Sequence, residues 1–199
     1  MPILEMLYEG GGLIWIILGC AFVAIAITIY CAITLRRILV IPPLLEKAQD
    51  PETARTLALS EGGPFSEVVN AVIETYSDSM QEAECAIESA GRRAAHRLSR
   101  GIGALELIAT LSPLLGLLGT VIGMYDAFKK IAISGMQEPG QLSGPISMAL
   151  VTTIAGLIVA IPTQISAAAF GRHVMKLTLE MERAAMHLRT RFRSWQESR

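Results

Sequence analysis

The chain has 199 residues, of which 52% are hydrophobic and 18% are charged, and its formal net charge at pH 7 is -1. Soluble domains carry about 25% charged residues, so a chain of this composition, with a mean hydropathy of +0.47, is too apolar for an ordinary soluble domain. The near-neutral charge excludes a strongly basic nucleic-acid-binding protein, and the three cysteines have neither paired nor metal-ligand spacing, so we predict no metal site and no cofactor.

Three uncharged runs predict three membrane spans. They cover residues 13–35, 107–125 and 139–171, and the last has its apolar core at 146–170. A helix needs about 20 such residues to cross a bilayer. We therefore predict an all-α polytopic membrane protein with spans at 13–35, 102–128 and 146–170. No basic residue precedes the first run, and it is longer than the roughly 7–15 apolar residues of a signal peptide, so we expect a permanent span.

The basic residues predict the orientation of these spans. Segments 36–101 and 171–199 together hold 15 of the 17 lysines and arginines. The positive-inside rule places such segments in the cytoplasm. The N-terminal residues 1–12 and the hairpin 129–145 are then predicted to be periplasmic.

The two predicted cytoplasmic segments have helical patterns. A break is expected at residues 61–64, whose sequence is Glu-Gly-Gly-Pro. Apolar residues then recur at steps of three and four, and no proline interrupts them, so we expect one long helix that continues into the second span, with Gly101 and Gly103 as its weak points. The tail repeats this pattern. These stripes predict a helical bundle that packs on itself, or alternatively a docking surface for a soluble partner. The recurring positions are Val69, Ile73, Tyr76, Met80, Ala83, Ile87, Ala90, Ala94 and Leu98, and in the tail Val174, Leu177, Met181, Ala184, Leu188, Phe192 and Trp195.

Spans two and three contain many small and polar residues. Glycines spaced three and four apart let helices approach closely in lipid, and a buried proline can kink a helix. We expect these residues to form a contact between helices or between subunits. The predicted packing and kink positions are Pro113, Gly116, Gly119 and Gly123 in span two, and Gly156 and Pro162 in span three.

One pair of hydroxyls is a candidate for an ion path. Thr120 is eight residues before Phe128, and Thr153 is seven residues after Ile146, so each is expected roughly 11 Å in from the outer end of its span. Two hydroxyls at one depth in adjacent antiparallel helices can line a polar path. The alternative for each is a bond back to a carbonyl one turn earlier in its own helix.

The sequences around these threonines resemble those of a known family. The run from Ala109 to Met124, ATLSPLLGLLGTVIGM, looks like the second-span motif of the ExbB/TolQ/MotA proton-channel family. The run from Ile146 to Pro162, ISMALVTTIAGLIVAIP, looks like its third-span motif. Three spans are typical of the ExbB and TolQ branch, with ExbB the closer of the two.

The resemblance implies a mechanism and partners. ExbB-like subunits form a ring, reported as a pentamer, in a bacterial inner membrane around the single spans of an ExbD-like or TolR-like partner. Proton flow moves one relative to the other and energises a TonB-like or TolA-like protein. Thr120 and Thr153 match the pore-lining threonines, and Pro113 matches the family proline. This implies a motor or stator subunit for outer-membrane transport and not an enzyme.

One departure from the family concerns a carboxylate. Some members have a glutamate five residues before the span-three threonine, where this chain has Met148. No predicted span has an acid near its middle, so a titrating group must come from a partner. Glu106 and Asp126, at the span edges, could guide protons or be simple interface charges. The alternatives that remain are a TolQ-like subunit for outer-membrane integrity and a passive helical membrane scaffold.

Overall fold

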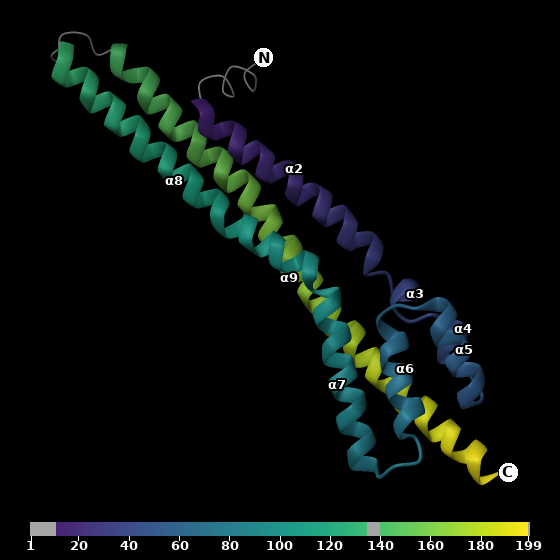
Figure 1. Ribbon diagram of the computed structural model, residues 1–199. Helices are drawn as coiled ribbons and strands as arrows, with labels where there is room; N and C mark the ends of the chain where they lie inside the picture. Colours follow the sequence, from purple (N-terminus) through teal and green to yellow (C-terminus); the bar gives the residue numbers. More distant parts are fainter. Residues whose placement is uncertain (1–10, 135–139, 199) are drawn as a thin grey trace. The chain divides into compact units, whose positions relative to one another are not determined.

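A computed structural model describes residues 11–134 and 140–198, and within them every regular element is an α-helix. Most of the predicted N-terminal segment 1–12 and the middle of the predicted hairpin 129–145 lie outside the described residues. The helices are α2 (Gly11–Thr34), α3 (Arg37–Val40), α4 (Pro43–Glu46), α5 (Pro51–Glu61), α6 (Pro64–Thr75), α7 (Met80–Leu98), α8 (Arg100–Ser134) and α9 (Gly140–Glu197) (Figure 1).

Three of these helices are long and apolar enough to cross a membrane. The candidate spans are Gly12–Thr34, Arg100–Ile133 and Ser143–Glu197, which belong to α2, α8 and α9. This confirms the predicted all-α class with three membrane helices. The second and third helices extend beyond the predicted spans, because α8 begins at Arg100 and α9 continues without a break to Glu197.

The chain divides into two compact units. The span unit comprises residues up to 29 together with 103–168, and the bundle unit comprises residues 30–102 and 169 onwards. In the span unit, α8 and the first part of α9 run side by side, and α2 lies along α9 (Figure 1). In the bundle unit, α4 packs on α5, α5 on α6, and α6 on α7.

The bundle unit has a core built from the predicted apolar stripes. Val69, Ala83, Ile87, Ala90 and Ala94 are buried, as are six of the seven tail positions, from Val174 to Phe192. The ring of Phe192 meets that of Tyr76 edge-on, with centroids 6.2 Å apart. Most positions of the two stripes therefore pack within the chain itself, whereas Met80 is 49% exposed.

The prediction of one long helix after residue 64 is wrong. Helix α6 ends at Thr75, and α7 starts at Met80 behind a capping box, in which the Ser79 hydroxyl accepts from the backbone N–H of Glu82 and the Glu82 carboxylate accepts from Ser79. This cap satisfies N–H groups that a helix start leaves open, so it stabilises a new helix rather than a continued one. A second break falls at Ser99, between α7 and α8. Gly101 and Gly103, the predicted weak points, lie inside α8.

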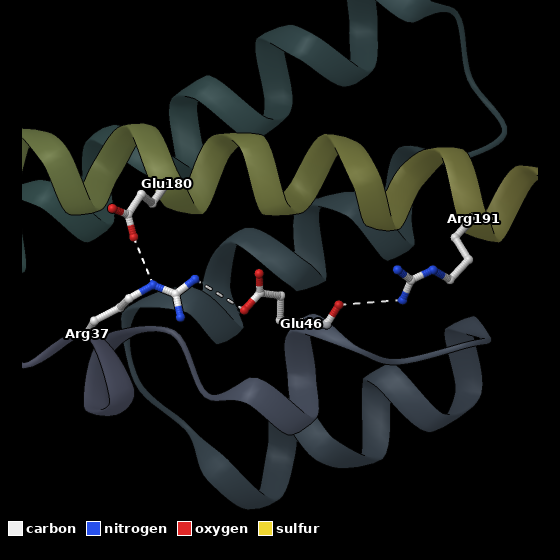
Figure 2. A network of polar contacts seen from close by, with 4 residues as sticks. All are labelled: Arg37, Glu46, Glu180 and Arg191. Carbon is white, nitrogen blue, oxygen red and sulfur yellow. Dashed lines mark hydrogen bonds and ion pairs between the residues drawn. The ribbon is translucent and has the colours of Figure 1, made fainter.

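A polar network fixes α3 and α4 to the C-terminal part of α9. The Arg37 guanidinium donates to a Glu180 carboxylate oxygen at 2.9 Å and to Glu46 at 3.4 Å. Arg191 donates to the backbone oxygen of Glu46 (Figure 2). It also donates to the backbone oxygen of Ala48. The bond to Glu180, followed by the charge of Glu46, raises the pKa of Arg37. Exposed ion pairs contribute less than about 1 kcal/mol each, so this network orients the segment more than it stabilises it.

Candidate ion path between helices α8 and α9

Glycines bring the backbones of α8 and α9 together. A Cβ atom on Gly116 would lie 2.9 Å from the Thr152 backbone oxygen, and one on Gly123 would lie 2.6 Å from the Pro145 oxygen. From the other helix, a Cβ atom on Gly156 would lie 2.5 Å from the Ser112 oxygen. A side chain at any of these positions would collide with backbone. We call Gly116, Gly119 and Gly123 of α8, with Gly156 of α9, the glycine contact.

Thr152 occupies the centre of this contact. Its side chain is fully buried, and its hydroxyl donates within α9 to the backbone oxygens of Met148 and Ala149, at 3.1 and 2.9 Å. A Cβ atom on Gly119 would collide with that hydroxyl and with the Thr152 Cβ. Thr152 is thus the side chain for which Gly119 makes room, and sequence reasoning had not singled it out as a packing residue.

The two predicted pore-lining threonines lie beside the glycine contact. Thr153 is partly buried, and its hydroxyl donates to the Gly116 backbone oxygen across the helix pair, at 3.1 Å, and to Ala149 in its own helix, at 3.3 Å. The Thr120 hydroxyl donates to the Leu117 backbone oxygen at 2.7 Å. The back-bonding alternative therefore holds for Thr120, whereas Thr153 also makes a bond between helices.

The register of the two helices differs from the equal depth expected for this pair. Thr153 is level with Gly116, four residues before Thr120. Four residues correspond to about 6 Å along a helix. The two hydroxyls are therefore about one turn apart. The expectation failed because it counted each residue from its own predicted span end, and those ends carry no information on register.

Helical geometry still places both threonines on one side of the pair. Gly116 of α8 and Ala149 of α9 each face the other helix. Each of the two threonines comes four residues after one of them, Thr120 after Gly116 and Thr153 after Ala149. Four residues are one turn plus about 40°, so each threonine is rotated by about 40° from the contact. Because the helices are antiparallel, equal rotations point to the same side of the pair. The groove between α2 and α9 is lined by Val159 and Ser166 of α9. These two residues are rotated from Ala149 by roughly a quarter turn in the direction opposite to Thr153, so α2 lies on the opposite side of the pair. The threonine side is therefore not covered by α2.

The two prolines have separate surroundings. Pro113 and Pro162 both stand inside helices, where proline removes one backbone hydrogen bond. Pro162 lines the groove against α2, which has a volume of about 340 Å³. Pro113 follows the fully buried Ser112, whose hydroxyl donates to the Ile108 backbone oxygen at 2.8 Å. Pro162 thus belongs to the α2 side of the helix pair, away from the threonines.

The predicted edge charges lie apart from the threonines. Asp126 lines an open hollow of about 560 Å³ together with Lys129, Lys130 and Met148. Met148 therefore shares a hollow with a carboxylate from the other helix. Glu106 is exposed, and its backbone oxygen accepts from the Thr110 hydroxyl. Among the described residues, no group of three His, Cys, Asp or Glu side chains could hold a metal ion.

Comparison with known proteins shows which family the chain belongs to. The sequence profile of the MotA/TolQ/ExbB proton channel family matches residues 61–183, more than half of the chain. The chain belongs to this family. It is therefore a membrane protein of a proton-channel family whose members are transporters and stators and not enzymes.

Individual relatives carry the ExbB name. Biopolymer transport protein exbB1 of Vibrio cholerae is 44% identical over 68 residues, which cover 34% of this chain and 30% of the relative. ExbB of Neisseria gonorrhoeae is 37% identical over 102 residues, 51% of this chain and 46% of the relative. A putative ExbB homologue of Methanothermobacter thermautotrophicus is 32% identical over 117 residues, 59% of this chain and 41% of the relative. The match spans less than half the length of each of these relatives.

Proposed function

We propose that this chain is an ExbB-like motor or stator subunit of a bacterial inner membrane. With an ExbD-like single-span partner, it would use the proton gradient to energise a TonB-like protein for transport at the outer membrane. Family membership and the ExbB names of its relatives support this proposal. In it, several copies of the chain, five by analogy with the family, surround the partner's span, and the N-terminus and the 129–145 hairpin are periplasmic.

The observation that carries the proposal is the side of the helix pair on which Thr120 and Thr153 lie. Their hydroxyls are on the side that α2 leaves uncovered, so that side is available to a partner helix. No Asp, Glu, Lys or Arg occurs between Leu107 and Tyr125 or between Ile146 and Phe170. Threonine does not titrate near pH 7, so a partner carboxylate would carry the proton while the threonines hydrogen-bond it or hold water.

Asp126 has no part in this proposed path. Its hollow is also lined by Lys129 and Lys130, whose two positive charges outnumber its own. Asp126 lies roughly a quarter turn around α8 from Gly116, on the other side of the helix pair from Thr120.

Co-purification with a genetic neighbour tests the proposal. A neighbouring gene for a short protein with one N-terminal span bearing an Asp would be expressed with this chain, and the pair purified through a tag on the partner. We expect a stable complex, and we expect loss of uptake that depends on the proton gradient when either gene is deleted. A TolQ-like role would instead give envelope leakage without loss of uptake. A chain that assembles alone, binds no such partner and has no effect on either readout would be a passive scaffold.

A further inference from the structure

A basic hollow lies in the bundle unit where α2 ends. It has a volume of about 300 Å³. One wall is formed by the last turn of α2 and by α3, and the opposite wall by the junction of α7 and α8. The residues used below are Tyr30, Thr34 and Leu39 on the first wall and Arg97, Leu98 and Arg100 on the second.

The charge of this hollow is positive. Two guanidinium groups, of Arg97 and Arg100, line it, and no carboxylate is among its lining residues. Arg97 is paired with Glu67. Arg100 is exposed and makes no ion pair within the part of the chain that the structure describes. Guanidinium groups bind phosphate through short, charge-assisted hydrogen bonds, so the hollow suits a phosphate-bearing anion.

The surroundings of the hollow are those of a membrane boundary. Tyr30 and Thr34 belong to the end of a candidate span. Two arginines, Arg36 and Arg37, follow after one more residue. Tyrosine and arginine are typical of the level of the lipid headgroups, where an apolar body meets a polar end. Leu39, which lines the hollow, and its neighbour Ile38 are 57% and 71% exposed. Exposed leucine and isoleucine beside two arginines fit a ligand that has both an anionic head and an apolar tail.

We propose that this hollow binds the headgroup phosphate of an anionic phospholipid. The Arg100 guanidinium and the Tyr30 hydroxyl contact the phosphate, and the part of an acyl chain nearest the headgroup lies along Leu39. Basic pockets beside transmembrane helices are a known form of lipid recognition. The lipid bridges the end of α2 and the break at Ser99 between α7 and α8, so it holds these two parts of the bundle unit together.

Lipid retention by the purified full chain tests this proposal. Native mass spectrometry would be recorded after mixing the protein, in detergent, with dioleoyl phosphatidylglycerol or with zwitterionic dioleoyl phosphatidylcholine. We expect the wild type to retain the anionic lipid in preference. Arg100→Gln should lower retention of the anionic lipid about tenfold, because it removes a charge-assisted contact, while Arg100→Lys should keep a part of it.

The matched control is Arg93→Gln, which removes an exposed arginine of α7 that does not line the hollow. It should retain lipid like the wild type, and helicity measured by circular dichroism should be equal for all variants. Equal retention by Arg100→Gln and wild type would overturn the proposal, as would equal retention of the two lipids by the wild type. Displacement of the lipid by glycerol 1-phosphate, which has no acyl chains, would overturn the lipid assignment in favour of a site for a soluble phosphate.

Discussion

Glu182 of α9 is a carboxylate whose surroundings disfavour its charge. Its Oε1 atom packs over Gly91 of α7, where an added Cβ atom would be only 2.9 Å away. Partial burial, followed by the negative charge of Glu88, raises the pKa of Glu182, and Arg92 offsets a part of this effect. Folding therefore disfavours the charged form of Glu182, so above its raised pKa the carboxylate lowers the stability of the bundle unit.

Glu182→Gln should therefore stabilise the protein at pH 7. A carboxyl with a raised pKa in the folded state destabilises above that pKa, and this cost disappears as the pH falls through it towards the ordinary value of 4.5. The midpoint of thermal unfolding of the variant, followed by circular dichroism in detergent, should exceed that of the wild type at pH 7, and the two should converge below pH 4.5. Glu84→Gln, on the exposed surface of α7, is the control and should show neither effect. A wild type that is more stable than Glu182→Gln at pH 7 would contradict this account.

Thr152 and Thr153 show how far residue-scale prediction extends. The sequence indicates that hydroxyls cluster in the third span, and the resemblance to the family motif selects Thr153 as the candidate pore-lining residue. It does not indicate which of two adjacent threonines packs against Gly119 and which reaches the Gly116 carbonyl. That difference depends on the rotation of α9 against α8, which is a property of the helix pair and not of either segment.

At the scale of elements, the glycine contact determines how closely α8 and α9 approach. Gly119→Ala should destabilise the protein by about 1–3 kcal/mol, because its Cβ atom collides with the buried Thr152 side chain. Unfolding midpoints in detergent would measure this. Gly103→Ala is a matched control in the same helix, since a Cβ atom there meets nothing within 4 Å. It should be neutral, or stabilising by up to about 1 kcal/mol through helix propensity.

The structure places the Gly119 contact within one chain, between two helices that are consecutive in sequence. An unfolding midpoint for Gly119→Ala equal to that of Gly103→Ala would show that the two helices do not depend on this approach. A lower midpoint together with an unchanged oligomer mass would locate the contact inside the subunit, as the structure has it.

The turn between α6 and α7 depends on one serine cap. Ser79→Ala should cost about 1 kcal/mol, because the N-cap hydroxyl satisfies a backbone N–H at the start of α7. In the reciprocal half of the cap, the Ser79 hydroxyl and backbone N–H donate to the Glu82 carboxylate and lower its pKa. This half therefore contributes above pH 4.5 and is lost as the pH falls through that lowered pKa. Thermal unfolding at pH 7 would measure the loss, and the exposed Ser77→Ala is the control. Equal effects of the two substitutions would mean that the cap does not hold the turn.

This cap also shows why one helix was predicted where two exist. The apolar stripe keeps its three-and-four spacing through residues 76–80, and the segment contains neither proline nor glycine. The serine and the glutamate three residues later were the available signal. By contrast, Gly62 and Gly63 predict the turn between α5 and α6 directly from the sequence. They adopt φ values of 62° and 91°, which residues with a side chain rarely adopt.

At the scale of the whole molecule, the distribution of basic residues predicts the orientation. Single cysteines at Lys130 and at Ser194, both exposed, would be placed in a background in which Cys20, Cys31 and Cys85 are replaced. An impermeant thiol reagent should label only the first in intact cells and both after permeabilisation, because the positive-inside rule puts the tail in the cytoplasm. Labelling of only Ser194→Cys in intact cells would reverse the topology.

Composition and hydropathy were enough to predict that this is a membrane protein, since uncharged apolar runs of 19 and more residues are typical of membrane-spanning helices. The polar network of Arg37 and Arg191 with α9 was not predicted. It joins residues more than 140 positions apart in the chain, and single-sequence patterns carry no information on such pairs.

The central claim is that the uncovered side of the α8–α9 pair, with Thr120 and Thr153, forms part of a proton path completed by a partner. The most direct test is proton flux into proteoliposomes that contain the chain and its single-span partner, driven by an imposed pH gradient and followed with a trapped dye. Thr153→Val keeps the branched shape and removes the hydroxyl, and an unmade buried hydrogen bond costs about 1–3 kcal/mol. We expect its flux to fall about tenfold or more at unchanged complex assembly. Thr110→Val, which loses only an exposed bond within α8, should conduct like the wild type. Equal flux through Thr153→Val and wild-type complexes would contradict the account.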